Sequence, residues 1–112
     1  MKAHILEETR MRELGFTDFA KEHWYYVQRV YKGVGWESVV TFNLTIPKDD
    51  PDKFKIDVLD EAFCQPYDYQ YLLAKYPDPP EAASIVRDNV NAILQKLMDA
   101  GIISDWKPGD YV

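Results

Sequence analysis

Hydrophobic and polar residues alternate along the middle of the chain, between residues 36 and 46. Alternation with period two is typical of a β-strand that buries one face. We predict a strand from Trp36 to Ile46 that stops there, because Pro47 cannot donate a hydrogen bond to a neighbouring strand. The buried face would carry Trp36, Ser38, Val40, Phe42, Leu44 and Ile46. The other face would carry Glu37, Val39, Thr41, Asn43 and Thr45.

Two further strands are predicted, one on each side of this strand in the sequence. Residues His23–Tyr31 are mostly aromatic or β-branched, and Gly33 and Gly35 after them suit a hairpin loop. After the polar turn Lys48–Asp52, a third strand is expected from Phe54 to Leu59. Consecutive strands joined by short turns predict a three-stranded antiparallel meander. The third strand would direct these residues toward the core: Phe54, Ile56 and Val58.

Two helices are predicted outside the meander from the spacing of apolar residues and from local signals. An N-terminal helix is expected over Lys2–Leu14, with Gly15 in the position of a C-terminal cap. The residue before Pro66 is disfavoured in helical conformation. A short helix is therefore expected only from Asp68, its N-cap, to Lys75.

The last helix has the most complete boundary signals in the chain. Asp78 is its predicted N-cap, Glu81 completes a capping box, and Gly101 follows the final turn. Ile102 is then placed to contact the last turn in a Schellman motif. The tail contains a proline-glycine turn and is expected to end in a short edge strand. The apolar stripe of the helix comprises Ile85, Val86, Val90, Ile93, Leu94 and Leu97.

These elements predict an α+β fold in one domain that spans residues 1–112. The three-stranded meander would pack against the long C-terminal helix, with the N-terminal helix and a short helix after the third strand as additions. The length and the 46% hydrophobic content are enough for one core.

Charge and cysteine content limit the classes of partner and compartment. The net charge of −6 repels phosphate backbones, which disfavours nucleic acid as a partner. Cys64 is the single cysteine and cannot form an internal disulfide, and a lone thiol favours a reducing compartment. The sequence shows no signal-peptide pattern and no apolar stretch long enough for a bilayer, so we expect a cytoplasmic protein outside membranes.

One group of carboxylates is a candidate for catalysis or metal binding. Asp57, Asp60, Glu61 and Asp68 could together hold Mg²⁺ or Ca²⁺, or act as an acid-base pair. Their spacing does not force them to converge, and the N-cap role already accounts for Asp68. We therefore expect no catalytic residue, no metal and no cofactor, and keep a small metal-dependent hydrolase or nuclease that uses these four residues as an alternative.

Two other sites of possible chemistry lack the necessary companions. Residues 49–52 contain three aspartates but neither the glycine nor the final glutamate of a calcium-binding loop. Cys64 has no neighbouring base in the sequence, since His4 and His23 lie far upstream. A buried, inert thiol is expected.

Aromatic residues exceed what a small core can bury, with eight tyrosines and three tryptophans. Exposed aromatic residues anchor protein interfaces because they bury a large area at a small entropic cost. The alternative is that most of them only close the two ends of the core. The interface candidates are Trp24, Tyr25, Tyr26, Gln65, Tyr67, Tyr69 and Tyr71.

Five phrases of the chain carry a resemblance to known proteins: Phe42–Lys48, Ile56–Glu61, Gln65–Gln70, Ala100–Ile103 and Gly109–Val112. They resemble phrases in small uncharacterised proteins of phages and prophages of Gram-positive bacteria, over residues 14–112, and Gln65–Gln70 is the most specific. The resemblance implies a phage accessory protein in the bacterial cytoplasm. It implies no activity and therefore no catalytic residue.

The sequence thus predicts a non-enzymatic module that binds a protein partner or a second copy of itself. Besides the hydrolase or nuclease, a second alternative is an acidic decoy, which would present carboxylates as phosphate mimics to a DNA-binding protein. Such a decoy would bind a basic partner in a strongly salt-dependent manner.

Overall fold

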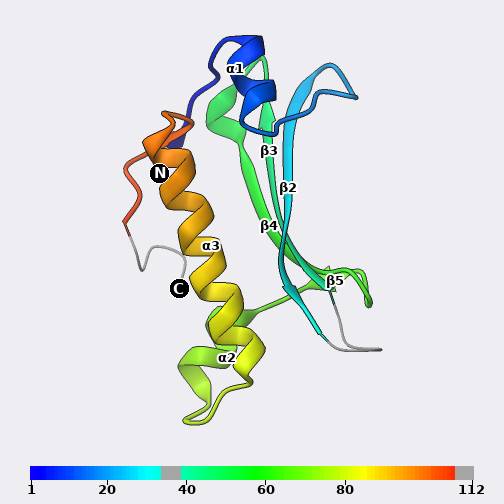
Figure 1. Cartoon of the computed structure of the whole chain (residues 1–112), viewed down its shortest axis with the longest axis vertical. Coiled ribbons are helices and arrows are strands. Elements are labelled where there is room, and N and C mark those ends of the chain that lie inside the picture. Colours follow the sequence, from blue (N-terminus) through cyan, green and yellow to red (C-terminus); the bar gives the residue numbers. More distant parts are fainter. Residues whose placement is uncertain (34–38, 108–112) are drawn as a thin grey trace.

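Helix α3 (Glu81–Asp99) lies across one face of an antiparallel sheet (Figure 1). The computed structural model describes residues 1–33 and 39–107 of the chain. The sheet has the strand order β2-β3-β4-β5. A second, two-stranded sheet pairs β1 with β6. The strands are β1 (Lys2–Ala3), β2 (His23–Lys32), β3 (Val39–Pro47), β4 (Lys55–Asp60), β5 (Gln65–Pro66) and β6 (Ile103–Ser104). The expectation of an α+β architecture with an antiparallel meander is confirmed.

The predicted inner face of β3 is confirmed for its described part. Phe42 is completely buried and lies opposite Gln28 of β2 and Val58 of β4. The other buried residues of this face are Val40, Leu44 and Ile46. Alternation places the polar residues of β3 on the opposite face because neighbouring side chains point to opposite sides of a strand. The expectations for Gly35, Trp36, Glu37 and Ser38 lie outside the described residues.

The main sheet has a fourth strand that the sequence analysis did not predict. β5 pairs with the end of β4, where Leu59 lies opposite Pro66 and Asp60 opposite Gln65. The chain reverses direction through Cys64, which has a φ angle of 50°. Gln65 was expected to be extended, and this turn brings its segment back alongside β4. The meander therefore has four strands and not three.

The N-terminal segment differs from the predicted helix at its start. Helix α1 spans only Glu8–Glu13, and the segment before it forms β1, which pairs with β6 near the other end of the chain. The predicted cap at Gly15 is confirmed: its φ is 100°, and Phe16 N–H donates to Met11 C=O at 3.0 Å in a Schellman arrangement. Met11 is fully buried, so α1 is docked on the core.

Helix α3 ends as predicted but begins later. The position before its first turn is occupied by Pro80 and not by Asp78, and no side chain caps it. At the other end, Gly101 N–H donates to Met98 C=O at 3.1 Å and Ile102 N–H donates to Leu97 C=O at 2.9 Å. These two bonds form the predicted Schellman motif. The buried stripe of the helix is Ala83, Val86, Val90, Ile93, Leu94 and Leu97, and Ile85 is half-buried.

Two short helical segments complete the described fold. Helix α2 (Tyr69–Lys75) begins after Asp68, whose carboxylate accepts the Tyr71 N–H at 3.2 Å, so the predicted cap is confirmed. The predicted polar turn after β3 contains the 3₁₀ helix η1 (Pro51–Lys53). None of the helices in the described ranges combines the length and apolar character that a membrane-spanning helix requires. The expected turn and edge strand in residues 108–112 lie outside those ranges.

Candidate interaction surface along strand β2

The sheet has an outer face that is directed away from α3. Residues that lie opposite each other on neighbouring strands share a face, so the register assigns the outer side chains. Val27 of β2, which lies opposite Asn43 of β3, is 62% exposed, so this part of the face is open to solvent. The outer residues are Tyr25, Val27, Arg29, Thr41, Asn43, Thr45, Lys55, Asp57 and Leu59.

Apolar side chains gather on the β2 side of this face. Phe19, in the loop before β2, is 81% exposed, and its ring stacks on Tyr25 at a centroid distance of 4.6 Å and an interplanar angle of 21°. Val27 follows Tyr25 on the same face of the strand. We call Phe19, Tyr25, Val27 and Arg29 the β2 margin.

The backbone holds the loop that presents Phe19. Thr17 N–H donates to Tyr25 C=O at 2.9 Å, and Tyr25 N–H donates to Thr17 C=O at 2.8 Å. The loop is therefore paired with β2 two residues before Phe19. This pairing keeps the loop beside β2, where the Phe19 ring stacks on Tyr25.

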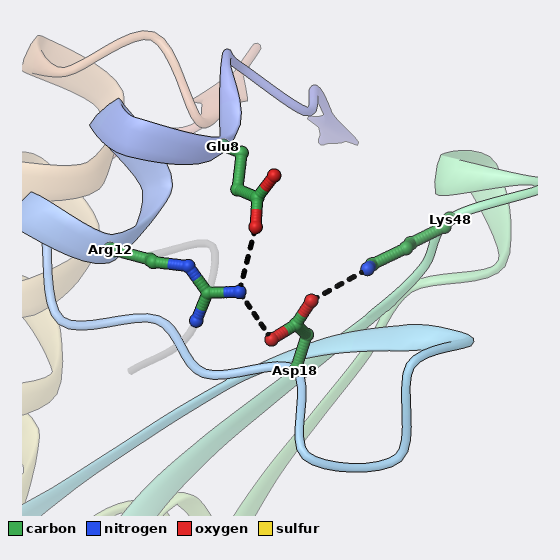
Figure 2. A network of polar contacts seen from close by, with 4 residues as sticks. All are labelled: Glu8, Arg12, Asp18 and Lys48. Atoms are coloured by element: carbon green, nitrogen blue, oxygen red, sulfur yellow. Dashed lines mark hydrogen bonds and ion pairs between the residues drawn. The ribbon is translucent and has the colours of Figure 1, made fainter.

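A network of charged side chains also holds this loop, through Asp18 (Figure 2). Arg12 of α1 contacts Glu8 at 2.9 Å and Asp18 at 2.7 Å, and Lys48 after β3 contacts the second oxygen of Asp18 at 2.9 Å. Asp18 directly precedes Phe19 and thus links α1, the loop and the end of β3. Both cations also lie near the ring of Trp24, with Arg12 Cζ at 5.2 Å and Lys48 Nζ at 4.7 Å from its centroid.

The network changes the protonation equilibria of its members. The hydrogen bond from Lys48, followed by that from Arg12, lowers the pKa of Asp18 below the ordinary aspartate value. The hydrogen bonds to Glu8 and then to Asp18 raise the pKa of Arg12. Both residues are charged at neutral pH, so the ion pairs that join the loop to α1 and to Lys48 can form there.

The lowered pKa of Asp18 predicts a pH-dependent stability. A carboxyl group whose pKa is lower in the folded state stabilises the fold above its unfolded pKa, and this contribution is lost as the pH falls through the folded pKa. We expect Asp18→Asn to unfold at a lower urea concentration than the wild type at neutral pH. The difference should shrink in acid below the ordinary aspartate pKa, and also at high salt, because the network is close to solvent.

A groove runs between the edge of β2 and helix α3. It consists of two adjoining depressions of about 310 Å³ and 350 Å³ that share Arg29 and Asn89. Asn89 Nδ2 donates to Val30 C=O at 2.7 Å and so joins the helix to the strand. The remaining residues that line the groove are Gln28, Val30, Tyr31, Lys32, Ile85, Ala92, Ile93 and Lys96. We call this the β2–α3 groove.

The structure corrects part of the predicted aromatic interface. Trp24, Tyr26 and Tyr69 are buried, with exposures of 3–5%. Trp24 and Tyr26 lie opposite Ile46 and Leu44 and therefore face the core. Tyr69 is buried at the start of α2. These three side chains cannot contact a partner while the domain is folded.

The other candidates do not form one surface. Gln65 and Tyr71 are exposed, whereas Tyr25 and Tyr67 are partly buried. β2 and β5 lie at opposite edges of the sheet, so Tyr25 is separated from the Gln65 segment by two strands. Burial, followed by the charges of Tyr31 and Asp60, raises the pKa of Tyr67. Its phenol therefore stays protonated and uncharged at neutral pH.

The four carboxylates proposed as a metal or catalytic site are each engaged locally. Asp57 pairs with Lys55 at 3.6 Å, and Asp60 accepts the N–H of Ala62 at 3.1 Å. Glu61 accepts a hydrogen bond from the Thr41 hydroxyl, and Asp68 caps α2. Across residues 1–33 and 39–107, no three His, Cys, Asp or Glu side chains gather in a way that could hold a metal ion. The hydrolase or nuclease alternative therefore lacks the convergence that it requires.

Cys64 lies at the surface, so the expectation of a buried thiol is wrong. The residue belongs to the turn between β4 and β5. Its Sγ is 3.7 Å from Glu61 C=O. His4 is hydrogen-bonded with Ser104, and the ring of His23 lies near that of Tyr25, so both histidines have other neighbours.

A further depression of about 740 Å³ lies where β1 approaches the end of β3. Its lining includes the cationic residues Lys2 and Lys48 and the acidic residues Glu8 and Asp52. Charges of both signs in similar number give it no clear preference for an anion or a cation.

The site residues that the sequence analysis missed are Phe19, Val27 and Arg29. Phe19 is an apolar residue within a polar loop, which is the one local sign of an exposed anchor. Val27 is two residues after Tyr25 and lies on the same face of β2, whereas Tyr26 lies on the opposite face. That alternation could have assigned it to the outer face.

Comparison with known proteins shows the fold but not a family. No family model matches the chain, and no curated protein matches it. Among solved structures, the chain is similar to the crystal structure of a DUF1831 family protein from Lactobacillus plantarum. The similarity has a TM-score of 0.69 at 12% sequence identity and covers 93% of this chain and 83% of the other. At this identity the two chains share a fold, and the likeness carries no function.

Proposed function

We propose that this protein is a non-enzymatic interaction module that binds a protein partner through the β2 margin. The observation that carries the proposal is the exposed apolar pair Phe19 and Val27 on the outer face of the sheet. Water around such side chains is released when a partner covers them, and aromatic residues are enriched at interfaces for this reason.

The way in which the margin is held supports the proposal. Phe19 is stacked on Tyr25, and its loop is fixed by the pairing of Thr17 and by the ion pairs of Asp18. An anchor that is ordered before binding loses less conformational entropy on association. The network at Asp18 thus serves to present the phenylalanine ring.

The resemblance to phage and prophage proteins suggests a setting for this module. We propose a phage accessory protein that acts on another protein in the bacterial cytoplasm. An interaction module needs no catalytic constellation, which agrees with the local roles of the four carboxylates.

Binding is expected to depend on the β2 margin and not on exposed aromatic residues in general. The double variant Phe19→Ala and Val27→Asp removes both anchors and adds a charge. Each anchor is expected to contribute about 1 kcal/mol or more, so association should weaken at least roughly tenfold. Association is measured by light scattering for self-assembly and by quantitative capture of partners from a bacterial lysate.

Tyr71→Ala is the matched control, because Tyr71 is an exposed aromatic residue on α2 at 49% exposure. Circular dichroism and urea unfolding show that all variants remain folded. If the double variant and the control retain the same partners at the same level, the margin is not the binding surface. A wild-type protein that stays monomeric and captures nothing specific also contradicts the proposal.

A further inference from the structure

The edge of β2 beside the β2–α3 groove has free backbone groups. Tyr25 uses its N–H and C=O to pair with Thr17 on the outer side of the strand. Backbone groups alternate in direction along an antiparallel strand, so Val27 and Arg29 direct theirs to the same side. β2 is the end strand of the sheet, and among the described residues no strand pairs with it there beyond Thr17. Such an edge can accept an added strand.

The groove beside this edge is basic although the protein is acidic. Arg29, Lys32 and Lys96 line it, and none of the described residues that line its two depressions is an Asp or Glu. Within the described ranges, these three cations form no ion pair, whereas six other Lys and Arg residues do. Lys96 Nζ lies 5.7 Å from the centre of the Tyr26 ring, which holds the ammonium group over the groove side of the core.

We infer that the β2–α3 groove binds a short, extended, acidic segment of the partner protein, which adds to the edge of β2 at Val27 and Arg29. The inference rests on the proposed function and names the chemistry of the partner. The segment's backbone would satisfy the free edge, and its carboxylates would pair with Arg29, Lys32 and Lys96. Every second side chain of an added strand faces the same side, so acidic residues at alternate positions would lie beside Arg29 on the outer face of β2, and Lys96 would attract them from the helix side of the edge.

The ends of the open edge limit the length of this segment. Thr17 occupies the edge at Tyr25, and the side chain of Asn89 takes the C=O of Val30. The strand also bulges between Arg29 and Tyr31. Only a few residues can therefore pair before the added strand must leave the edge.

The same features disfavour a second copy of this chain at the groove. Antiparallel pairing of two β2 edges would bring the Arg29 residues of both copies close together, and like charges repel. Continued pairing would also meet the Thr17 segment of the other copy. An oligonucleotide could pair its phosphates with the cations, but it has no peptide backbone to form hydrogen bonds with the edge of β2.

The inference is tested with the full chain and two synthetic peptides. One peptide alternates glutamate and valine, and the other carries lysine in place of each glutamate. Fluorescence anisotropy should show binding of the acidic peptide only, with affinity falling as salt rises. Arg29→Ser combined with Lys96→Glu should weaken this binding at least tenfold. Amide signals of Val27 and Arg29 should shift on titration in NMR spectra.

Lys75→Glu on α2 is the matched control because it reverses a charge at a residue that lines neither depression of the groove. It should leave the affinity within about twofold of the wild type. Equal binding of the lysine peptide, tighter binding of a single-stranded oligonucleotide, or no binding of the acidic peptide would each overturn the inference. If the acidic peptide fails while the Phe19 and Val27 variant still loses its captured partner, the inference falls and the proposed function stands.

Discussion

Replacing Phe42 with alanine is expected to lower the free energy of unfolding by about 3–5 kcal/mol. Phe42 is fully buried on the central part of β3, and its ring meets that of Tyr26 edge-on at a centroid distance of 6.2 Å. Alanine would leave a cavity between the sheet and α3 that the strands on both sides cannot close. A domain of this size has a total stability of about 5–15 kcal/mol, so a large part of it would be lost. Equilibrium unfolding in urea measures the effect.

The control for this prediction is Val27→Ala on the outer face. Val27 belongs to the neighbouring strand but is mostly exposed, so its truncation should change stability by no more than about 0.5 kcal/mol. Equal midpoints for the Phe42 and Val27 variants would mean that the sheet does not bury the face assigned to it here.

Much of the sheet was predictable because its signal is local. In β3 the period of two is visible within the strand itself, and it identified the buried residues Val40, Phe42 and Leu44 without knowledge of any partner. The Schellman motif at Gly101 was predictable for the same reason, since a glycine after a helical stripe is read from adjacent residues.

The errors arose where residues far apart in the sequence decide the structure or where local signals compete. β1 is extended because it pairs with β6, and the residues near Lys2 carry no local signal that predicts this pairing. At the start of α3, the sequence Asp78-Pro-Pro-Glu81 allows two helix starts, one capped by Asp78 and one that begins only after Pro80. The helix begins after the second proline, so the aspartate lies too early to cap it.

The candidate site was predictable by residue type but not by position. An excess of aromatic residues correctly indicated that some reach the surface, yet composition does not say which. The alternation of side chains along β2 decides which aromatic residues are exposed: Trp24 and Tyr26 face the core, whereas Tyr25 faces outward. The groove joins Arg29 of β2 to Lys96 of α3, which become neighbours only after the helix has docked on the sheet.

The same docking explains how an acidic chain acquires a basic groove. The core requires α3 to lie across the sheet with its apolar stripe inward, which brings the flank with Asn89 and Lys96 to the edge of β2. The hydrogen bond from Asn89 to Val30 fixes the helix at that edge. The packing of α3 therefore determines both the stability of the domain and the shape of the groove.

Replacing Leu97 with alanine should lower the free energy of unfolding by about 2–5 kcal/mol. Leu97 is fully buried in the last turn of α3, and its C=O accepts the Ile102 N–H of the Schellman motif. The loss of the side chain would remove packing at the point where the helix ends and the chain turns toward β6. Urea unfolding measures the change, with Gln95→Ala as the control because Gln95 is exposed on the same helix. If Leu97→Ala were as stable as Gln95→Ala, the apolar stripe by which α3 packs on the sheet would be wrongly assigned. The residues of α3 that line the groove would then be wrongly assigned as well.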